Sequence, residues 1–238
     1  MNEGKTALVE QQHYLYKPTS REIDLQNKET SGLQRIKGSP RIWYIDIEGD
    51  GAGIFKLHRY SDTQNERAAY IISKIVGFDF VPPTVLRKIN GEEGSLQEFV
   101  EDGKFMDEVE QSEKVKKGLY KYWIFGHIIR NMERSDWNLL VKEDKVFSID
   151  HDASFDPDFA NPANFDLFRQ YYGEEAPNEL IETFKFYLGD RSRQETLKST
   201  LQELLSPEDV EITTQRLEHI GNLLVKNGKI NSQTELTI

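Results

Sequence analysis

The sequence predicts an α+β fold in two lobes. Alternating β-forming residues and turn signals concentrate before about residue 100, long amphipathic patterns typical of helices follow, and no internal repeat is present. This segregation favours a β-rich N-lobe, a helical C-lobe and a cleft between them. We expect an N-terminal arm over residues 1–38, partly ordered or forming an early strand, then an N-lobe over 39–101 and a C-lobe over 102–238.

The predicted N-lobe opens with a hairpin and continues into a helix. β-Forming residues alternate over 41–47, the Gly-rich stretch 48–53 is typical of a turn, and the strand is expected to return over 54–57. A helix over 62–76 should follow, ended by Gly77. Its apolar positions share one face: Ala68, Ala69, Ile71, Ile72 and Ile75.

The remaining elements change from extended to helical along the chain. Extended segments are expected at 81–89 and 95–100, with a turn over 90–94. Two short strands, at 138–142 and 145–149, interrupt the helical part. The expected helices are 109–132, 164–172, 177–188, 193–205 and 207–227.

Composition excludes several classes of protein. With 30 basic and 41 acidic residues the net charge is −11, which argues against nucleic acid or an anionic membrane as a partner. The absence of cysteine excludes disulfides, thiolate metal sites and thiol nucleophiles. The start of the chain is polar and no apolar run is long enough to span a bilayer. We therefore expect a soluble cytoplasmic protein, and the sequence carries no signal of its oligomeric state.

Acidic residues are concentrated in one segment. Between residues 92 and 113, Lys104 is the only basic residue among nine carboxylates. A solvated acidic face explains such a run, and a surface that attracts a basic partner explains it as well. The carboxylates are Glu92, Glu93, Glu98, Glu101, Asp102, Asp107, Glu108, Glu110 and Glu113.

The spacing of three polar residues after the predicted long helix indicates phosphoryl-transfer chemistry. Glu133 lies five residues before Asn138, and Asp150 follows Asn138 by twelve residues, across the two short strands. In a kinase catalytic loop an Asn and a later Asp hold Mg²⁺ on the nucleotide phosphates, while an earlier carboxylate faces the acceptor hydroxyl. We therefore expect Asn138 and Asp150 to be metal ligands and Glu133 to be the catalytic base. Trp137, inside the loop, is expected to pack against the C-lobe.

Two residues earlier in the chain fit the same chemistry. Lys56 lies on the strand that follows the Gly-rich turn, and Glu66 lies in the first turn of the next helix. A kinase places a lysine on the phosphates and holds it with a helix carboxylate. Gly51 and Gly53 would let the turn cover the phosphates with backbone N–H groups. Each feature alone is a weak indication of a kinase. The indication is stronger because these features precede the predicted catalytic loop in the order that a kinase requires.

Several segments resemble the bacterial relatives of phosphatidylinositol 3- and 4-kinases, and they are also similar to HipA-type kinases. The resemblance runs from about Gly49 to Phe155 and is carried by residues 66–86 (ERAAYIISKIVGFDFVPPTVL), the 131–138 loop and the strand end at Asp150. It implies an atypical protein-kinase-like fold that binds ATP and Mg²⁺. It further implies that Lys56 is the phosphate lysine, Glu66 its partner, and Asn138 and Asp150 the metal ligands. The implied hinge, which pairs with adenine through backbone groups, is Gln97, Glu98, Phe99 and Val100.

The catalytic loop departs from that family at two positions. Where the family has Asp-Arg-His, this chain has Glu133, Arg134 and Ser135. Glu is one methylene longer than Asp, and a displacement of about 1 Å can cost on the order of 100-fold in rate. Asp136 is an alternative base, although it lies only two residues before Asn138. The sequence therefore supports ATP binding more strongly than it supports catalysis.

The sequence favours a kinase that phosphorylates a protein Ser or Thr. A lipid kinase must dock on an anionic surface, which both the net charge and the acidic 92–113 segment oppose. A pseudokinase that binds nucleotide and acts through protein interaction is an alternative, supported by Glu133 and Ser135. Transfer of AMP by the same fold is a further alternative that sequence does not separate from phosphorylation.

Overall fold

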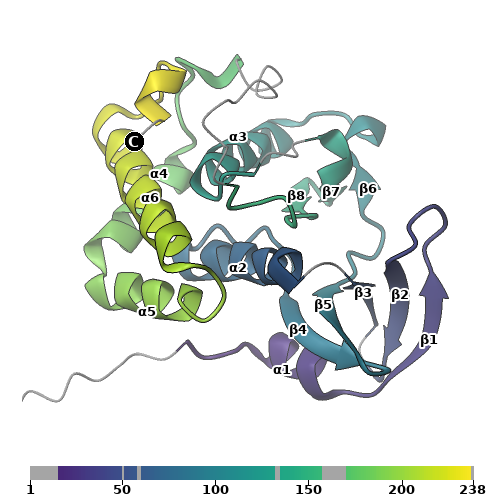
Figure 1. Ribbon diagram of the computed structural model, residues 1–238. Helices are drawn as coiled ribbons and strands as arrows, with labels where there is room; N and C mark the ends of the chain where they lie inside the picture. Colours follow the sequence, from purple (N-terminus) through teal and green to yellow (C-terminus); the bar gives the residue numbers. More distant parts are fainter. Residues whose placement is uncertain (1–15, 50, 58–59, 132–134, 157–169, 237–238) are drawn as a thin grey trace, which may run out of the picture.

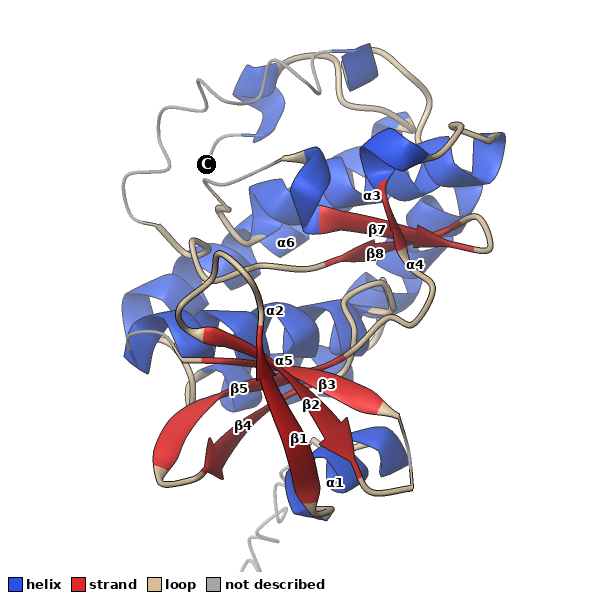
Figure 2. Cartoon of the chain, turned by 90° about the vertical axis from the view of Figure 1, so that its right-hand side faces the viewer, coloured by secondary structure: helices blue, strands red, loops and turns tan. Residues whose placement is uncertain are grey.

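The two lobes are visible in the computed structural model, which describes residues 16–49, 51–57, 60–131, 135–156 and 170–236. A twisted antiparallel sheet forms one end of the molecule, and a mainly helical part with a small second sheet forms the other (Figures 1 and 2). Helix α2 (Tyr60–Val76) lies between them and contacts both β4 and β5 on one side and α5 on the other. Strands of the main sheet and the helical bundle are therefore segregated along the chain.

The N-lobe sheet has five strands in the order β1-β2-β3-β5-β4. Its strands are β1 (Thr30–Arg35), β2 (Ile42–Ile47), β3 (Ala52–Lys56), β4 (Thr84–Ile89) and β5 (Glu92–Glu98), and every neighbouring pair is antiparallel. A short helix, α1 (Ser20–Asn27), contacts β4 and β5. The side chains of Thr19 and Glu22 form a capping box that starts this helix.

The C-lobe is built around α3 (Glu113–Ile128), α4 (Asn178–Gly189), α5 (Arg191–Leu201) and α6 (Pro207–Asn227). A three-stranded sheet of β6 (Lys104–Phe105), β7 (Leu139–Lys142) and β8 (Lys145–Ser148) packs against α3. Three short 3-10 helices complete the described elements: η1 (Met106–Glu108), η2 (Asp136–Asn138) and η4 (Gln233–Leu236).

Each lobe has its own hydrophobic cluster. The smaller one lies within the N-lobe and is formed by Leu25, Ile45, Ile47, Phe55, Val85, Ile89 and Leu96. The larger one fills the C-lobe and includes the predicted apolar face of α2, whose five residues are all buried. The apolar face of α2 packs into the C-lobe cluster. This helix, which carries Glu66, is therefore held in a fixed position against the helical lobe.

The α+β class predicted from the sequence is confirmed, and most predicted elements are present with shifted ends. The long helix was expected from residue 109, but it begins at Glu113 because the Ser112 side chain accepts from the amide of Val115 and caps it. The turn expected over 90–94 is only Asn90 and Gly91, both with positive φ, so β5 begins at Glu92.

The N-terminal segment was left open between an arm and an early strand. Residues 20–35 form α1 and β1, and β1 pairs with β2 at the edge of the main sheet. The boundaries proposed at 38/39 and 101/102 stay predictions. The helix expected over 164–172 lies largely outside the described residues.

Candidate active site

A buried lysine joins the two lobes. Lys56, at the end of β3, donates from Nζ to Oε1 of Glu66 on α2 at 2.5 Å and to Oδ1 of Asp150 at 2.7 Å. Asp150 follows β8 in the C-lobe, 94 residues further along the chain. The structure therefore brings together three of the site residues that the sequence singled out, from three separate elements.

The three side chains differ in their access to solvent. Glu66 is fully buried and Lys56 nearly so, whereas 37% of the Asp150 side chain is exposed. Burial alone would lower the pKa of Lys56, but the carboxylates of Glu66 and Asp150 outweigh burial and raise it. The ammonium is therefore charged at any physiological pH. A fixed cation next to an accessible carboxylate is the arrangement that a phosphate group and a metal ion require.

The β7–β8 hairpin places Asn138 beside Asp150. Asn138 ends η2 immediately before β7, and its carbonyl accepts from the amide of Ile149 at 3.0 Å. Asp150 then has a φ of +63°, a left-handed conformation that is uncommon outside glycine and turns the chain sharply after β8. The two predicted metal ligands thus lie at the open ends of one hairpin.

Buried contacts hold the segment that follows Asp150. His151 is fully buried, with Nε2 3.1 Å from Oγ of Ser148 and Nδ1 3.5 Å from Nδ2 of Asn131. Burial lowers the pKa of His151 to about 4, so the ring is neutral at pH 7. Asn65 of α2 donates to the carbonyls of Asp152 at 2.8 Å and Ser154 at 2.9 Å. Asn65 was not identified from the sequence, because a single Asn on a helix carries no signal of a long-range contact.

The predicted Gly-rich turn and hinge meet at a cavity of about 340 Å³. The N-lobe lines it with Tyr44, Gly51 and Ala52, and the C-lobe with Lys142 and Phe147. The remaining lining residues are Arg21, Pro82, Glu98, Phe99, Val100 and Glu101. Its position between the lobes makes it the candidate pocket for a nucleotide base.

The two glycines predicted to matter in the turn have different roles. Gly51 has a φ of +85° and open space around it, so it supplies a backbone conformation that other residues rarely adopt. A Cβ on Gly53 would lie 2.6 Å from Cδ1 of Leu96 and 3.2 Å from the carbonyl oxygen of Gln97. Gly53 therefore allows β3 to pack closely on β5. Residue 50 of the turn lies outside the described residues.

Side-chain contacts fix the hinge from behind. Nε2 of Gln97 donates to Oγ1 of Thr84 at 2.9 Å, and Glu98 forms an ion pair with Nε of Arg21 at 2.7 Å. Phe99 packs edge-on against Tyr44 with ring centroids 5.3 Å apart. The side chains of Gln97 and Glu98 are thus engaged in structural contacts. The Arg21 contact could not be expected from sequence, because the two residues lie 77 positions apart.

The catalytic loop is only partly described. Glu133, the predicted base, and Arg134 lie outside the described residues, so that prediction is not tested. Asp136 is exposed in η2. Trp137 was expected to pack against the C-lobe: its ring meets that of Phe105 in β6 edge-on at 5.5 Å, although 63% of Trp137 is exposed.

The residues present fit a magnesium ion. An amide oxygen from Asn138 and a carboxylate oxygen from Asp150 are the hard donors that Mg²⁺ prefers, and Asp150 is accessible. Within the described ranges no group of three or more His, Cys, Asp or Glu residues could hold a metal without other ligands. Oxygens of a bound nucleotide and water would therefore have to complete the coordination.

Comparison with known proteins assigns the class that this fold and site define. The family model for phosphatidylinositol 3- and 4-kinases matches residues 57–213, more than half of the chain. The chain therefore belongs to this kinase family, and it is a phosphotransferase of the phosphatidylinositol-kinase-related type. No curated protein matches the sequence.

Several solved structures share the fold at low sequence identity. The Golgi casein kinase has a TM-score of 0.55 at 14% identity, over 87% of this chain and 75% of the other. Fam20 of hydra, solved with sugar, has a TM-score of 0.56 at 13% identity over 87% and 90%. CtkA, a proinflammatory kinase of Helicobacter pylori, has a TM-score of 0.51 at 13% identity over 90% and 97%. The Golgi casein kinase was also solved with Mn and ADP bound.

These likenesses confirm the atypical kinase-like fold predicted from the sequence. They do not identify a substrate, because at such identities only the fold is shared. None of the helices in the described ranges is long and apolar enough to cross a membrane.

Proposed function

We propose that this protein transfers the γ-phosphoryl group of ATP to a hydroxyl group, in a reaction that depends on Mg²⁺. The observation that supports the proposal is the contact of Lys56 with both Glu66 and Asp150, because these are the residues predicted to be the phosphate lysine, its helix partner and a metal ligand. Lys56 would neutralise phosphate charge, and Glu66 would hold its ammonium in place. Asn138 and Asp150 would hold Mg²⁺, which when bound neutralises charge that develops on the phosphates.

Backbone groups of the hinge are the proposed contacts of adenine. The amide of Glu98 donates to the carbonyl of Pro83 at 2.8 Å, and the amide of Phe99 donates to that of Ala52 at 3.0 Å. Among the described residues no backbone carbonyl accepts from the amide of Val100, which lines the 340 Å³ cavity. We therefore assign adenine recognition within the predicted hinge to Val100, while Gly51 and Gly53 shape the turn near the phosphates.

The proposed acceptor is a Ser or Thr side chain of a protein, oriented by Glu133. Glu101, from the acidic 92–113 segment, lines the hinge cavity, and Asp136 is exposed beside Asn138. Carboxylates near the cleft would attract a basic protein and repel an anionic membrane surface. A cytoplasmic location is part of this proposal.

Mass spectrometry separates the proposal from its alternatives. The protein is incubated with ATP and Mg²⁺, alone and with a basic Ser/Thr-containing protein, and intact masses are measured. A gain of about 80 Da per site indicates phosphorylation and supports the proposal. A gain of about 329 Da, the mass of a transferred AMP group, would overturn it in favour of AMP transfer. No mass change with ATP still bound would favour the pseudokinase, and Asp150→Asn serves as the matched inactive control.

A further inference from the structure

Three successive residues of α2 contact three different parts of the protein. Asn65 donates to two carbonyls of the loop that follows Asp150. Glu66 accepts from Lys56, and Arg67 contacts α1. Because successive residues of a helix point about 100° apart, these contacts hold α2 from three sides. The contacts of Asn65 and Glu66 belong to the candidate active site, whereas Arg67 lies outside it.

A buried carboxylate of α1 receives Arg67. Oε1 of Glu22 accepts from Nη1 of Arg67 at 2.7 Å. Its Oε2 accepts from the hydroxyl of Tyr16 at 2.5 Å and from the amide of Thr19 at 2.8 Å. Only 1% of the Glu22 side chain is exposed. Burial alone would raise the pKa of Glu22, but these hydrogen bonds and the charge of Arg67 outweigh burial and lower it. The buried carboxylate is therefore charged at neutral pH.

The same region of α1 is connected to the hinge. Arg67 also donates from Nη1 to the carbonyl of Thr84, whose hydroxyl accepts from Nε2 of Gln97 at 2.9 Å. Nε of Arg21, the residue before Glu22, pairs directly with Oε1 of Glu98 at 2.7 Å. Through two adjacent residues, α1 therefore reaches both the hinge and the helix that carries the partner of the phosphate lysine.

The position of α1 on the sheet does not depend on Glu22 alone. Arg87 of β4 donates from Nη1 to the carbonyl of Leu25 at 2.7 Å and from Nη2 to the carbonyl of Lys28 at 2.5 Å. The side chain of Leu25 is fully buried in the N-lobe cluster. These contacts anchor the C-terminal end of α1, so it offers Glu22 to Arg67 from a fixed support.

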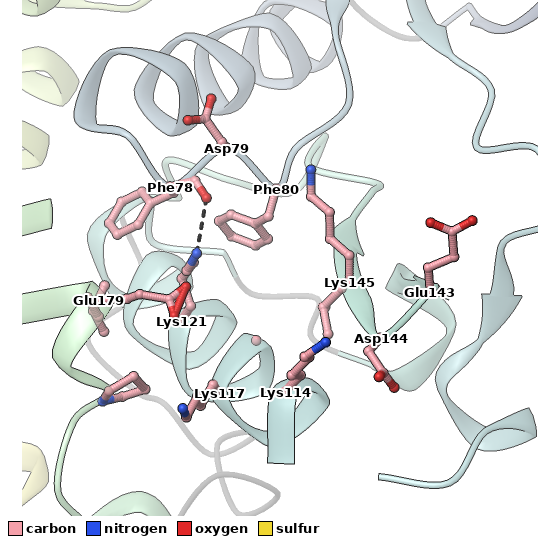
Figure 3. Close-up of a pocket in the computed structure, with 14 residues that line it drawn as sticks. Phe78, Asp79, Phe80, Lys114, Lys117, Lys121, Glu143, Asp144, Lys145 and Glu179 are labelled. Atoms are coloured by element: carbon pink, nitrogen blue, oxygen red, sulfur yellow. Dashed lines mark hydrogen bonds between the residues drawn. The ribbon is translucent and has the colours of Figure 1, made fainter. Parts of the chain in front are cut away.

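The C-terminal end of α2 is held by the other lobe. Lys121 of α3 donates from Nζ to the carbonyl of Phe78 at 3.2 Å, just past the end of α2 (Figure 3). Arg193 of α5 donates from Nη1 to the carbonyl of Ile75 at 3.0 Å. The C-lobe thus fixes the last turn of α2, while the contact of Arg67 holds its first half against the N-lobe.

We propose that Glu22 is a positioning residue for phosphoryl transfer. Through Arg67, it holds α2 in the orientation in which Glu66 contacts Lys56. This role rests on the proposed function, because a kinase requires the lysine–glutamate pair to be in place. Glu22 precedes residues 57–213, which the family model matches, so membership of the family does not itself assign it a role.

A double-mutant cycle in an assay of Mg²⁺-dependent ATP consumption tests this inference. We expect Glu22→Gln to lower kcat by about three- to tenfold, and by no more than Glu66→Gln does, since a small misplacement of a supporting group slows the chemical step. The double variant should have a kcat within about twofold of Glu66→Gln, because Glu22 acts through Glu66. A loss that multiplies with that of Glu66→Gln would indicate a merely structural role and overturn the proposal. Gln at position 22 can still form the capping box, so α1 should remain folded.

The matched control is Asp24→Asn, which makes the same acid-to-amide change on the same helix. Asp24 pairs locally with Lys28 at 3.7 Å, and a partly exposed pair of this kind contributes little. Its kcat should stay within about twofold of wild type. An equal fall of kcat in Asp24→Asn and Glu22→Gln, or a kcat of Glu22→Gln within about twofold of wild type, would contradict a positioning role.

Hydrogen exchange of the nucleotide-free protein, followed by mass spectrometry, supplies a readout that does not depend on activity. We expect the amides of α2 to exchange about threefold faster or more in Glu22→Gln, and at the wild-type rate in Asp24→Asn. Equal exchange in all three proteins would overturn the proposal. A wild-type protein that consumes no ATP would instead refute the proposed function, and the exchange rates would then decide whether Glu22 holds α2.

Discussion

Replacing Lys56 should destabilise the protein as well as stop catalysis, because Glu66 would lose its counter-charge. Lys56→Met leaves the carboxylate of Glu66 fully buried, and its Oε2 already has no hydrogen-bond partner in the described structure. Removing one member of a buried ion pair costs about 3–5 kcal/mol. The contact with Asp150 adds little to this cost because that carboxylate is more than one-third exposed.

The loss is measurable by urea unfolding without nucleotide, followed by circular dichroism. In thermal unfolding of a chain of this size, the same loss of about 3–5 kcal/mol corresponds to a fall in Tm of roughly 6–20 °C. The double variant Lys56→Met/Glu66→Gln should recover at least about 2 kcal/mol, because the uncompensated charge is gone. If Lys56→Met lies within about 1 kcal/mol of wild type, or the two changes are additive within about 0.5 kcal/mol, the buried pair is not coupled as described.

Three further predictions concern catalysis and pH. Glu66→Gln should reduce phosphoryl transfer less than Lys56→Met, since it releases only the orientation of the lysine; a larger defect in a kinetic assay would mean that Glu66 has a direct role. Glu133→Gln should lower turnover by a factor of roughly 10² to 10⁴ with little change in ATP affinity, whereas Asp136→Asn should have only a mild effect on turnover. Unchanged turnover in both variants would exclude Glu133 as the base. The folded-state pKa of His151, about 4, lies below its ordinary value of 6.5, so the unfolded state binds more protons between these values. Stability should therefore fall as pH drops from about 6.5 to 4, by up to about 3 kcal/mol, and urea unfolding of a His151→Gln variant should show a flatter profile.

Local patterns predicted the elements that hold the site, and long-range contacts were not predictable. The apolar face of α2 identified the helix that carries Glu66, and the turn between two β-forming runs identified β3 with Lys56. Periodicity reports on a segment and its solvent, so it does not reveal which distant side chain Arg21 or Asn65 contacts. The fold class followed from the order of elements.

Errors at element ends have local causes. The Asn90–Gly91 turn is two residues long because both accept positive φ, and Ser112 starts α3 later than its apolar pattern suggests. The exposure of Trp137 could not be expected either, since a large aromatic residue is more often buried.

The central claim is that Asp150, beside Lys56, supplies a metal ligand for phosphoryl transfer. Mg²⁺-dependent ATP consumption by wild type and Asp150→Asn, with folding of both checked by circular dichroism, tests it most directly. We predict that the variant folds but loses Mg²⁺-dependent turnover, because a neutral amide is a far weaker ligand for a hard cation than a carboxylate. Turnover within tenfold of wild type would contradict this claim and remove Asp150 from the metal site.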